Sequence, residues 1–143
     1  MEIEMRPIYQ VVCEWLRDFP SPKRCVMDIT CATELGKHLT SLGYVHTDTD
    51  LSILEIDLCD KSVRESKQYD VIIALLALER LKDMRRFVRM LPVGMRLITT
   101  FKNLSSVDDI YYYFYGMLGI TAYQQVQLNN GDMVSMVDAR RKE

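Results

Sequence analysis

Apolar residues recur along the chain with two different periods, and their alternation indicates the fold class. Between residues 8 and 16 they follow the spacing of one helical face, which predicts a helix that ends at the proline-rich stretch 19–22. Similar reasoning predicts helices at 34–42, at 81–91 and after a capping serine, Ser105 or Ser106. Short apolar runs instead predict strands at 25–29, 69–78 and 95–101, with one or two more at 44–47 and 53–56.

The end of the chain carries a strong turn signal. The stretch NNGD favours a tight turn, which predicts a hairpin of strands 120–128 and 133–139. Strands that alternate with helices are typical of a mostly parallel sheet with helices on both faces. We therefore expect one α/β domain over residues 1–143, in which the helix within 1–20 packs on the sheet and an antiparallel hairpin closes it.

Composition narrows the classes of function. The formal net charge is −2, so the whole chain has no bulk attraction to nucleic acid or anionic membranes. No apolar run approaches the roughly 20 residues that span a bilayer, and residues 1–20 do not resemble a signal peptide, which predicts an intracellular protein without membrane contact. The four cysteines and two histidines lack the spacing of zinc ligands, so no metal is expected.

Two stretches carry a resemblance to a known family. CVMDITCATELGKHL resembles the first motif of class I S-adenosylmethionine-dependent methyltransferases, in which a strand precedes Asp-x-Gly-x-Gly-x-Gly. YDVIIALLALERLKDMRRFVRMLPVGMRLITTF resembles their middle block, and the closing hairpin resembles their last two strands. Among subgroups, the ribosomal-RNA-processing methyltransferases look most similar. The resemblance implies a Rossmann-like sheet of six to seven strands and a site for S-adenosylmethionine.

The resemblance also implies roles for individual residues. Asp28 would lie near the methionine amino group of the cofactor, and Thr30, Ala32 and Glu34 occupy the three glycine positions. The remaining matches concern the ribose, the adenine and the reactive methyl group. They are Asp50 for the ribose hydroxyls, Asp57 with Leu58 for the adenine, and Ala74 with Leu75 beside the methyl group.

Three departures from the family pattern bear on activity. Side chains replace all three glycines, although glycines there permit a positive φ and a close approach of the ligand. Only six residues separate Asp50 from Asp57, which is too few for the usual crossover between parallel strands. The fourth strand of the family pattern ends here in Ala-Leu-Leu-Ala and offers no general base, so we predict no catalytic residue.

Two further stretches suggest partners. Five cations lie within ten residues, and they indicate either an RNA-contacting face or an ordinary solvated helix face: Arg80, Lys82, Arg85, Arg86 and Arg89. In YYYFY, Tyr113 and Phe114 fall on the inner helical stripe. Tyr111, Tyr112 and Tyr115 fall outside it, which favours a protein interface or the edge of the core over base stacking.

These observations leave three classes of function open. The first is a methyltransferase-like protein with an impaired cofactor pocket that works as a structural or regulatory subunit. The second is an active methyltransferase, most plausibly on RNA. The third is a module that binds a small ligand in the cleft of the sheet without chemistry. The glycine losses favour the first class, because crowding at positions 30, 32 and 34 opposes binding of the methionine moiety.

Overall fold

The computed structural model describes residues 3–29, 33–48 and 69–143. Its six strands are β1 (Cys25–Asp28), β2 (Val45–Asp48), β3 (Val71–Ala74), β4 (Arg96–Phe101), β5 (Leu118–Gln127) and β6 (Met133–Arg141). The helices are α1 (Arg6–Asp18), α2 (Thr33–Ser41), α5 (Met84–Met90) and α6 (Val107–Tyr113), with a 3-10 helix η2 (Leu78–Arg80). The predicted strand at 53–56 lies outside the described residues.

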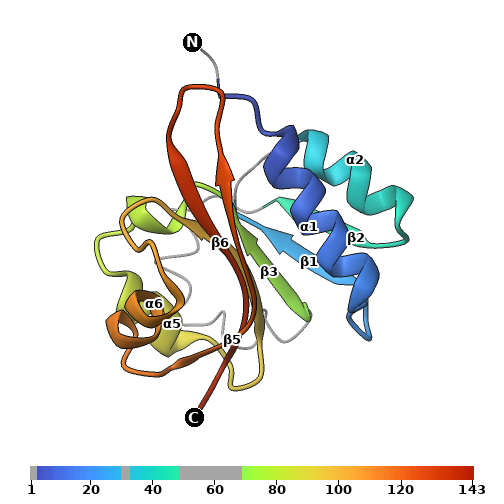
Figure 1. Cartoon of the computed structure of the whole chain (residues 1–143). Coiled ribbons are helices and arrows are strands. Elements are labelled where there is room, and N and C mark those ends of the chain that lie inside the picture. Colours follow the sequence, from blue (N-terminus) through green and yellow to red (C-terminus); the bar gives the residue numbers. More distant parts are fainter. Residues whose placement is uncertain (1–2, 30–32, 49–68) are drawn as a thin grey trace.

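The strands form one mixed sheet in the order β2-β1-β3-β4-β6-β5. The first four in this order pair in parallel, whereas β6 pairs antiparallel with both β4 and β5. In Figure 1, α1 and α2 lie on one side of the sheet, and α5 and α6 lie on the other. The predicted α/β class and its closing antiparallel hairpin are therefore confirmed.

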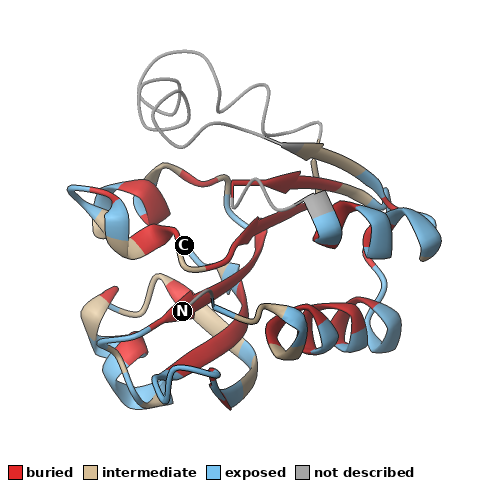
Figure 2. Cartoon of the chain, turned by 90° about the horizontal axis from the view of Figure 1, so that it is seen from above, coloured by how far each residue is buried: buried red, intermediate tan, exposed pale blue. Residues whose placement is uncertain are grey.

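Alternation along the strands divides the interior into two cores. Val26, Ile73 and Ile98 point toward α1 and α2, whereas Met27 and Ile72 point toward α5 and α6. Figure 2 shows the buried residues along the strands and on the inner sides of the helices. Both faces of the central strands are covered, which explains why these strands read as continuous apolar runs.

Polar side chains set where the helices begin. The Ser106 side chain accepts a hydrogen bond from the Asp109 amide at 3.1 Å, so this residue caps α6 as one of the two predicted serines. Asp83 caps α5 in the same way, because its Oδ1 accepts from the Arg86 amide at 3.0 Å. This cap explains why α5 begins at Met84 rather than at the predicted residue 81.

The second half of the predicted strand 69–78 is wrong. The strand β3 ends at Ala74, and Leu76 adopts the left-handed conformation with φ 54°. The Leu76 amide donates to Thr100 Oγ1 at 2.7 Å, which fastens the turn to β4. Ala77 and Leu78 are buried all the same, because the 3-10 helix returns them to the core. An apolar run alone does not distinguish a strand from a buried turn.

Candidate functional site

The carboxyl ends of the parallel strands meet at one edge of the sheet, as in other open α/β sheets. Asp28 is the last residue of β1, and its register partner in β3 is Ile73. Ala74 ends β3 and Leu75 follows it, so these two residues and Asp28 lie at the same edge. The other predicted cofactor residues lie outside the described residues: Thr30, Ala32, Asp50, Asp57 and Leu58.

Asp28 forms a buried pair with His46. The distance between Asp28 Oδ2 and His46 Nε2 is 2.8 Å, and the two side chains are 0% and 10% exposed. The parallel register pairs His46 with Val26, two residues before Asp28, so both polar side chains lie on the face of the sheet that α1 and α2 cover. The carboxylate that the family resemblance assigns to the cofactor is thus bonded within the chain.

A glycine of α2 makes room for this pair. A Cβ atom at Gly36 would lie 2.8 Å from Nδ1 and 3.0 Å from Cε1 of His46, which is closer than a carbon atom tolerates. The imidazole therefore packs against the bare backbone of α2 on one side and reaches Asp28 on the other. Sequence spacing alone does not indicate this pair, because 18 positions separate Asp28 from His46. The available signal was a histidine in the strand that neighbours the one ending in Asp28.

The carboxyl end of β3 is apolar and closed. Leu75 is 1% exposed, and residues 74–78 contain no acidic, basic or hydroxyl side chain. Beyond them, Glu79 accepts from the Lys102 amide at 2.5 Å and from the Asn103 amide at 3.2 Å, one bond to each carboxylate oxygen. Glu79 therefore ties η2 to the loop after β4.

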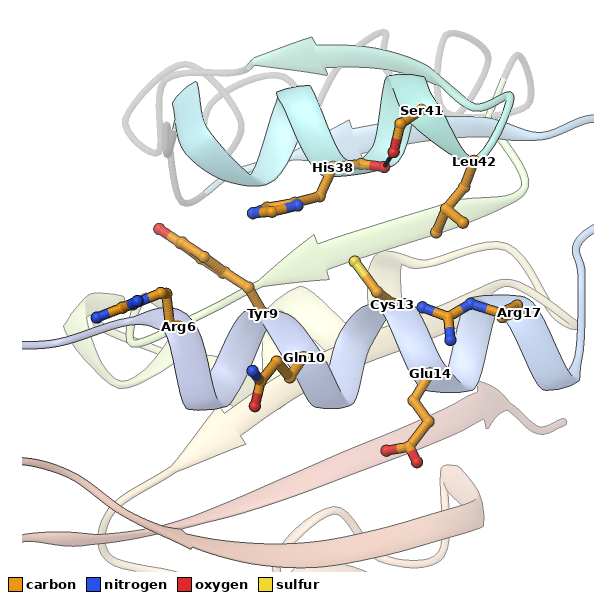
Figure 3. Close-up of a pocket in the computed structure, with 9 residues that line it drawn as sticks. All are labelled: Arg6, Tyr9, Gln10, Cys13, Glu14, Arg17, His38, Ser41 and Leu42. Atoms are coloured by element: carbon orange, nitrogen blue, oxygen red, sulfur yellow. Dashed lines mark hydrogen bonds between the residues drawn. The ribbon is translucent and has the colours of Figure 1, made fainter.

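A separate groove of about 440 Å³ lies between α1 and α2. In Figure 3, Tyr9 and His38 point toward each other across it, and Cys13 points from α1 toward α2. Burial raises the pKa of Tyr9, with the charges of Glu34 and Asp28 adding to the effect. Burial also raises the pKa of the Cys13 thiol, partly offset by a nearby arginine. Both groups are therefore protonated at neutral pH.

The predicted basic and aromatic stretches contact each other on the opposite side of the sheet. Arg85 Nε donates to the carbonyl of Tyr113 at 2.7 Å. Its guanidinium carbon lies 4.2 Å from the ring centroid of Tyr113 and 4.9 Å from that of Tyr115. Tyr111, Tyr112 and Tyr115 are exposed, as the helical stripe predicts.

The described residues offer neither a metal site nor a membrane span. Within residues 3–29, 33–48 and 69–143, no group of three or more His, Cys, Asp or Glu side chains could hold a metal ion. No helix in the described part of the chain is long and apolar enough to cross a membrane.

Comparison of the sequence with known proteins finds no protein-family model and no curated protein that matches. Comparison of the structure with solved structures finds methyltransferases of similar fold. Burkholderia thailandensis 1,6-didemethyltoxoflavin-N1-methyltransferase superposes with a TM-score of 0.68 at 11% identity, over 97% of this chain and 78% of that one. Magnesium protoporphyrin IX methyltransferase from Synechocystis PCC 6803, solved with S-adenosylmethionine, gives 0.63 at 18% identity, over 94% and 78%.

An rRNA methylase from Escherichia coli also superposes, with a TM-score of 0.53 at 13% identity, over 92% of this chain and 63% of that one. Identities this low establish a shared fold and leave the reaction of this chain open. The strand order with its antiparallel β6 agrees with these superpositions. The chain therefore has the fold of class I S-adenosylmethionine-dependent methyltransferases.

Proposed function

We propose that this protein is a methyltransferase-fold subunit with an impaired cofactor site, which works by binding partners rather than by transferring methyl groups itself. The observation that carries the proposal is the buried pair of Asp28 and His46. A methionine amino group that approached Asp28 would compete with the imidazole. The amino group would have to break the bond from a nearly buried imidazole Nε2, and loss of a buried hydrogen bond costs about 1–3 kcal/mol.

Two further features support the proposal. Thr30, Ala32 and Glu34 stand where related proteins have glycines, and a β-branched threonine disfavours a positive φ. The apolar end of β3 provides no general base beside the position of a reacting methyl group. This second feature weighs less, because positioning alone can accelerate methyl transfer.

The alternative is an active S-adenosylmethionine-dependent methyltransferase on RNA. One observation favours it, since Asp28 and Leu75 lie at the same edge of the sheet, where enzymes of this fold bind their cofactor. Two of the superposed proteins were also solved with S-adenosylmethionine or S-adenosylhomocysteine. The two functions differ in one measurable quantity, the affinity of the isolated chain for the cofactor.

Isothermal titration calorimetry with S-adenosylmethionine and S-adenosylhomocysteine tests the proposal. We expect dissociation constants weaker than about 1 mM, which corresponds to a binding free energy of about −4 kcal/mol. A variant with Thr30→Gly, Ala32→Gly and Glu34→Gly should gain about tenfold or more, about 1.4 kcal/mol. Adding Asp28→Asn should remove that gain. Micromolar binding by the unmodified chain would overturn the proposal and favour the active enzyme.

A further inference from the structure

The end of α6 meets α5 at a surface that combines cations with exposed aromatic rings. Arg85 and Arg89 lie four residues apart in α5 and therefore on the same helical face. Tyr111, Tyr112 and Tyr115 belong to the last turn of α6 and the residues after it. We call these five residues the Arg–Tyr surface. Figure 1 shows α5 and α6 side by side, and the hydrogen bond from Arg85 to the Tyr113 carbonyl joins them.

The tyrosine rings are presented outward. Tyr112 is 72% exposed and Tyr115 is 73% exposed, whereas Tyr111 is 47% exposed and packs edge-on against Tyr112 with ring centroids 5.5 Å apart. The guanidinium of Arg85 covers one side of the Tyr115 ring, at 4.9 Å from its centroid. Because most of Tyr115 remains exposed, its other side is open to a planar ligand.

The backbone holds Tyr115 in an uncommon conformation. Its φ of 51° lies in the left-handed region, which is unfavourable for a bulky side chain. Gly116 follows with φ 74°, where an added Cβ would lie 3.0 Å from the hydroxyl of Tyr111. A turn of this kind places the ring beside Arg85 instead of in the core. The two residues form the Schellman turn that ends α6, because the Gly116 amide donates to the Tyr111 carbonyl at 2.9 Å and the Tyr115 amide donates to the Tyr112 carbonyl at 3.1 Å.

The chain segments that carry the rings and the two arginines are poor in acidic residues. No Asp or Glu occurs from residue 84 to 102 or from 110 to 131, although the whole chain carries −2. Arg141 adds another cation, because its Nε donates to the Val88 carbonyl of α5 at 3.0 Å. The acidic border of the Arg–Tyr surface is formed by Asp83, which caps α5, and by Asp108 and Asp109 in the first turn of α6.

From this arrangement we infer that the Arg–Tyr surface binds single-stranded nucleic acid. Bases stack on exposed tyrosine rings and on guanidinium planes, and phosphates pair with the adjacent arginines. Tyrosine and arginine are also enriched at protein interfaces, so an acidic protein partner is the competing outcome that the experiment below separates. The inference names the partner class of the proposed binding function and therefore rests on it.

Fluorescence anisotropy with a short labelled oligoribonucleotide tests this inference on the full chain. The same sequence as DNA tests whether the ligand must be RNA. A duplex tests the need for unpaired bases, and a poly-glutamate peptide tests whether negative charge without bases is enough for binding. We expect both single strands to bind more tightly than the duplex and the peptide. Equal or tighter binding of the peptide would overturn the inference in favour of an acidic protein partner. Binding of none of the probes at low salt would also overturn it.

Matched variants locate the binding. Tyr112→Ala should weaken binding about tenfold and leave the salt dependence unchanged, because it removes stacking alone. Tyr115→Asn should weaken binding in the same way, because it also removes a ring. Asparagine is chosen here because it tolerates the left-handed backbone conformation. Phe19→Ala is the aromatic control, because Phe19 is 66% exposed at the end of α1 on the other side of the sheet. Equal losses in Phe19→Ala and the tyrosine variants would contradict the assignment.

Charge variants complete the design. Arg89→Glu should weaken binding and reduce the slope of log K against log salt by about 0.7 per lost phosphate contact. Lys37→Glu, at an exposed position of α2, makes the same charge change away from the surface and should have no such effect. An equal effect of both would mean that net charge alone drives binding. Calorimetry with the cofactor concerns the strand ends and this assay concerns α5 and α6, so either proposal can fail alone.

Discussion

The substitution Asp138→Asn tests how the two halves of the sheet are held together. Arg96 and Asp138 are 2% and 3% exposed and form two parallel hydrogen bonds, Nε to Oδ1 at 2.9 Å and Nη2 to Oδ2 at 2.5 Å. The same guanidinium donates to the carbonyls of Phe19 at 2.5 Å and Trp15 at 3.3 Å. One buried cation therefore joins β4, β6 and the carboxyl end of α1.

The expected magnitude follows from burial. Asparagine keeps the shape of the aspartate but removes its charge, so the buried guanidinium of Arg96 loses its counter-ion. Breaking a buried pair in this way costs about 3–5 kcal/mol. Small domains have a total stability of about 5–15 kcal/mol, so the loss is a large part of it.

Urea unfolding followed by circular dichroism measures this loss. The matched control is Asp132→Asn, because Asp132 pairs with Lys102 at 3.5 Å and both side chains are about half exposed. That variant should lose about 0–1 kcal/mol. A double variant, Arg96→Met with Asp138→Leu, should recover most of the stability that Asp138→Asn loses, since it removes both charges of this buried pair. Equal losses in Asp138→Asn and Asp132→Asn would refute the reasoning.

Three other predictions concern the site and its supports. Gly36→Ala should lower the unfolding free energy by about 1–3 kcal/mol, because the new methyl group meets the buried His46 ring; a higher melting temperature would contradict the packing described for His46. Burial raises the pKa values of Tyr9 and Cys13, so the folded chain holds both protons more tightly. The stability that these two protons contribute should be fully present below about pH 9 and should fall as the pH rises through 9 and 10. In denaturant titrations at alkaline pH, the double variant Tyr9→Phe with Cys13→Ala should show a smaller decline. Ser106→Ala should cost about 1 kcal/mol in the same denaturant assay through loss of the α6 cap, and an unchanged midpoint would count against that cap.

Local patterns predicted most of the fold. Helical periods, turn residues and the NNGD signal depend on neighbours in sequence, so the elements and the closing hairpin followed from them. The end of β3 could not be predicted, because the run of apolar residues continues through the turn at Leu76. That turn depends on the Thr100 hydroxyl of another strand, which no local pattern contains.

The candidate sites were less accessible to sequence reasoning. The motif indicated Asp28, but its partner His46 follows from the register of β1 with β2 and from the absence of a side chain at Gly36. Arg85 and Tyr113 are 28 positions apart in sequence, so no local pattern indicates that they are in contact in space. Both contacts depend on tertiary packing.

The impairment of the cofactor site is tested most directly by the structure of crystals grown with millimolar S-adenosylhomocysteine. We predict that His46 Nε2 stays within hydrogen-bonding distance of Asp28 and that no ligand density appears at the carboxyl ends of β1 and β3. Density for the intact ligand against Asp28, with the His46 ring turned away, would contradict the claim that this pair impairs the cofactor site.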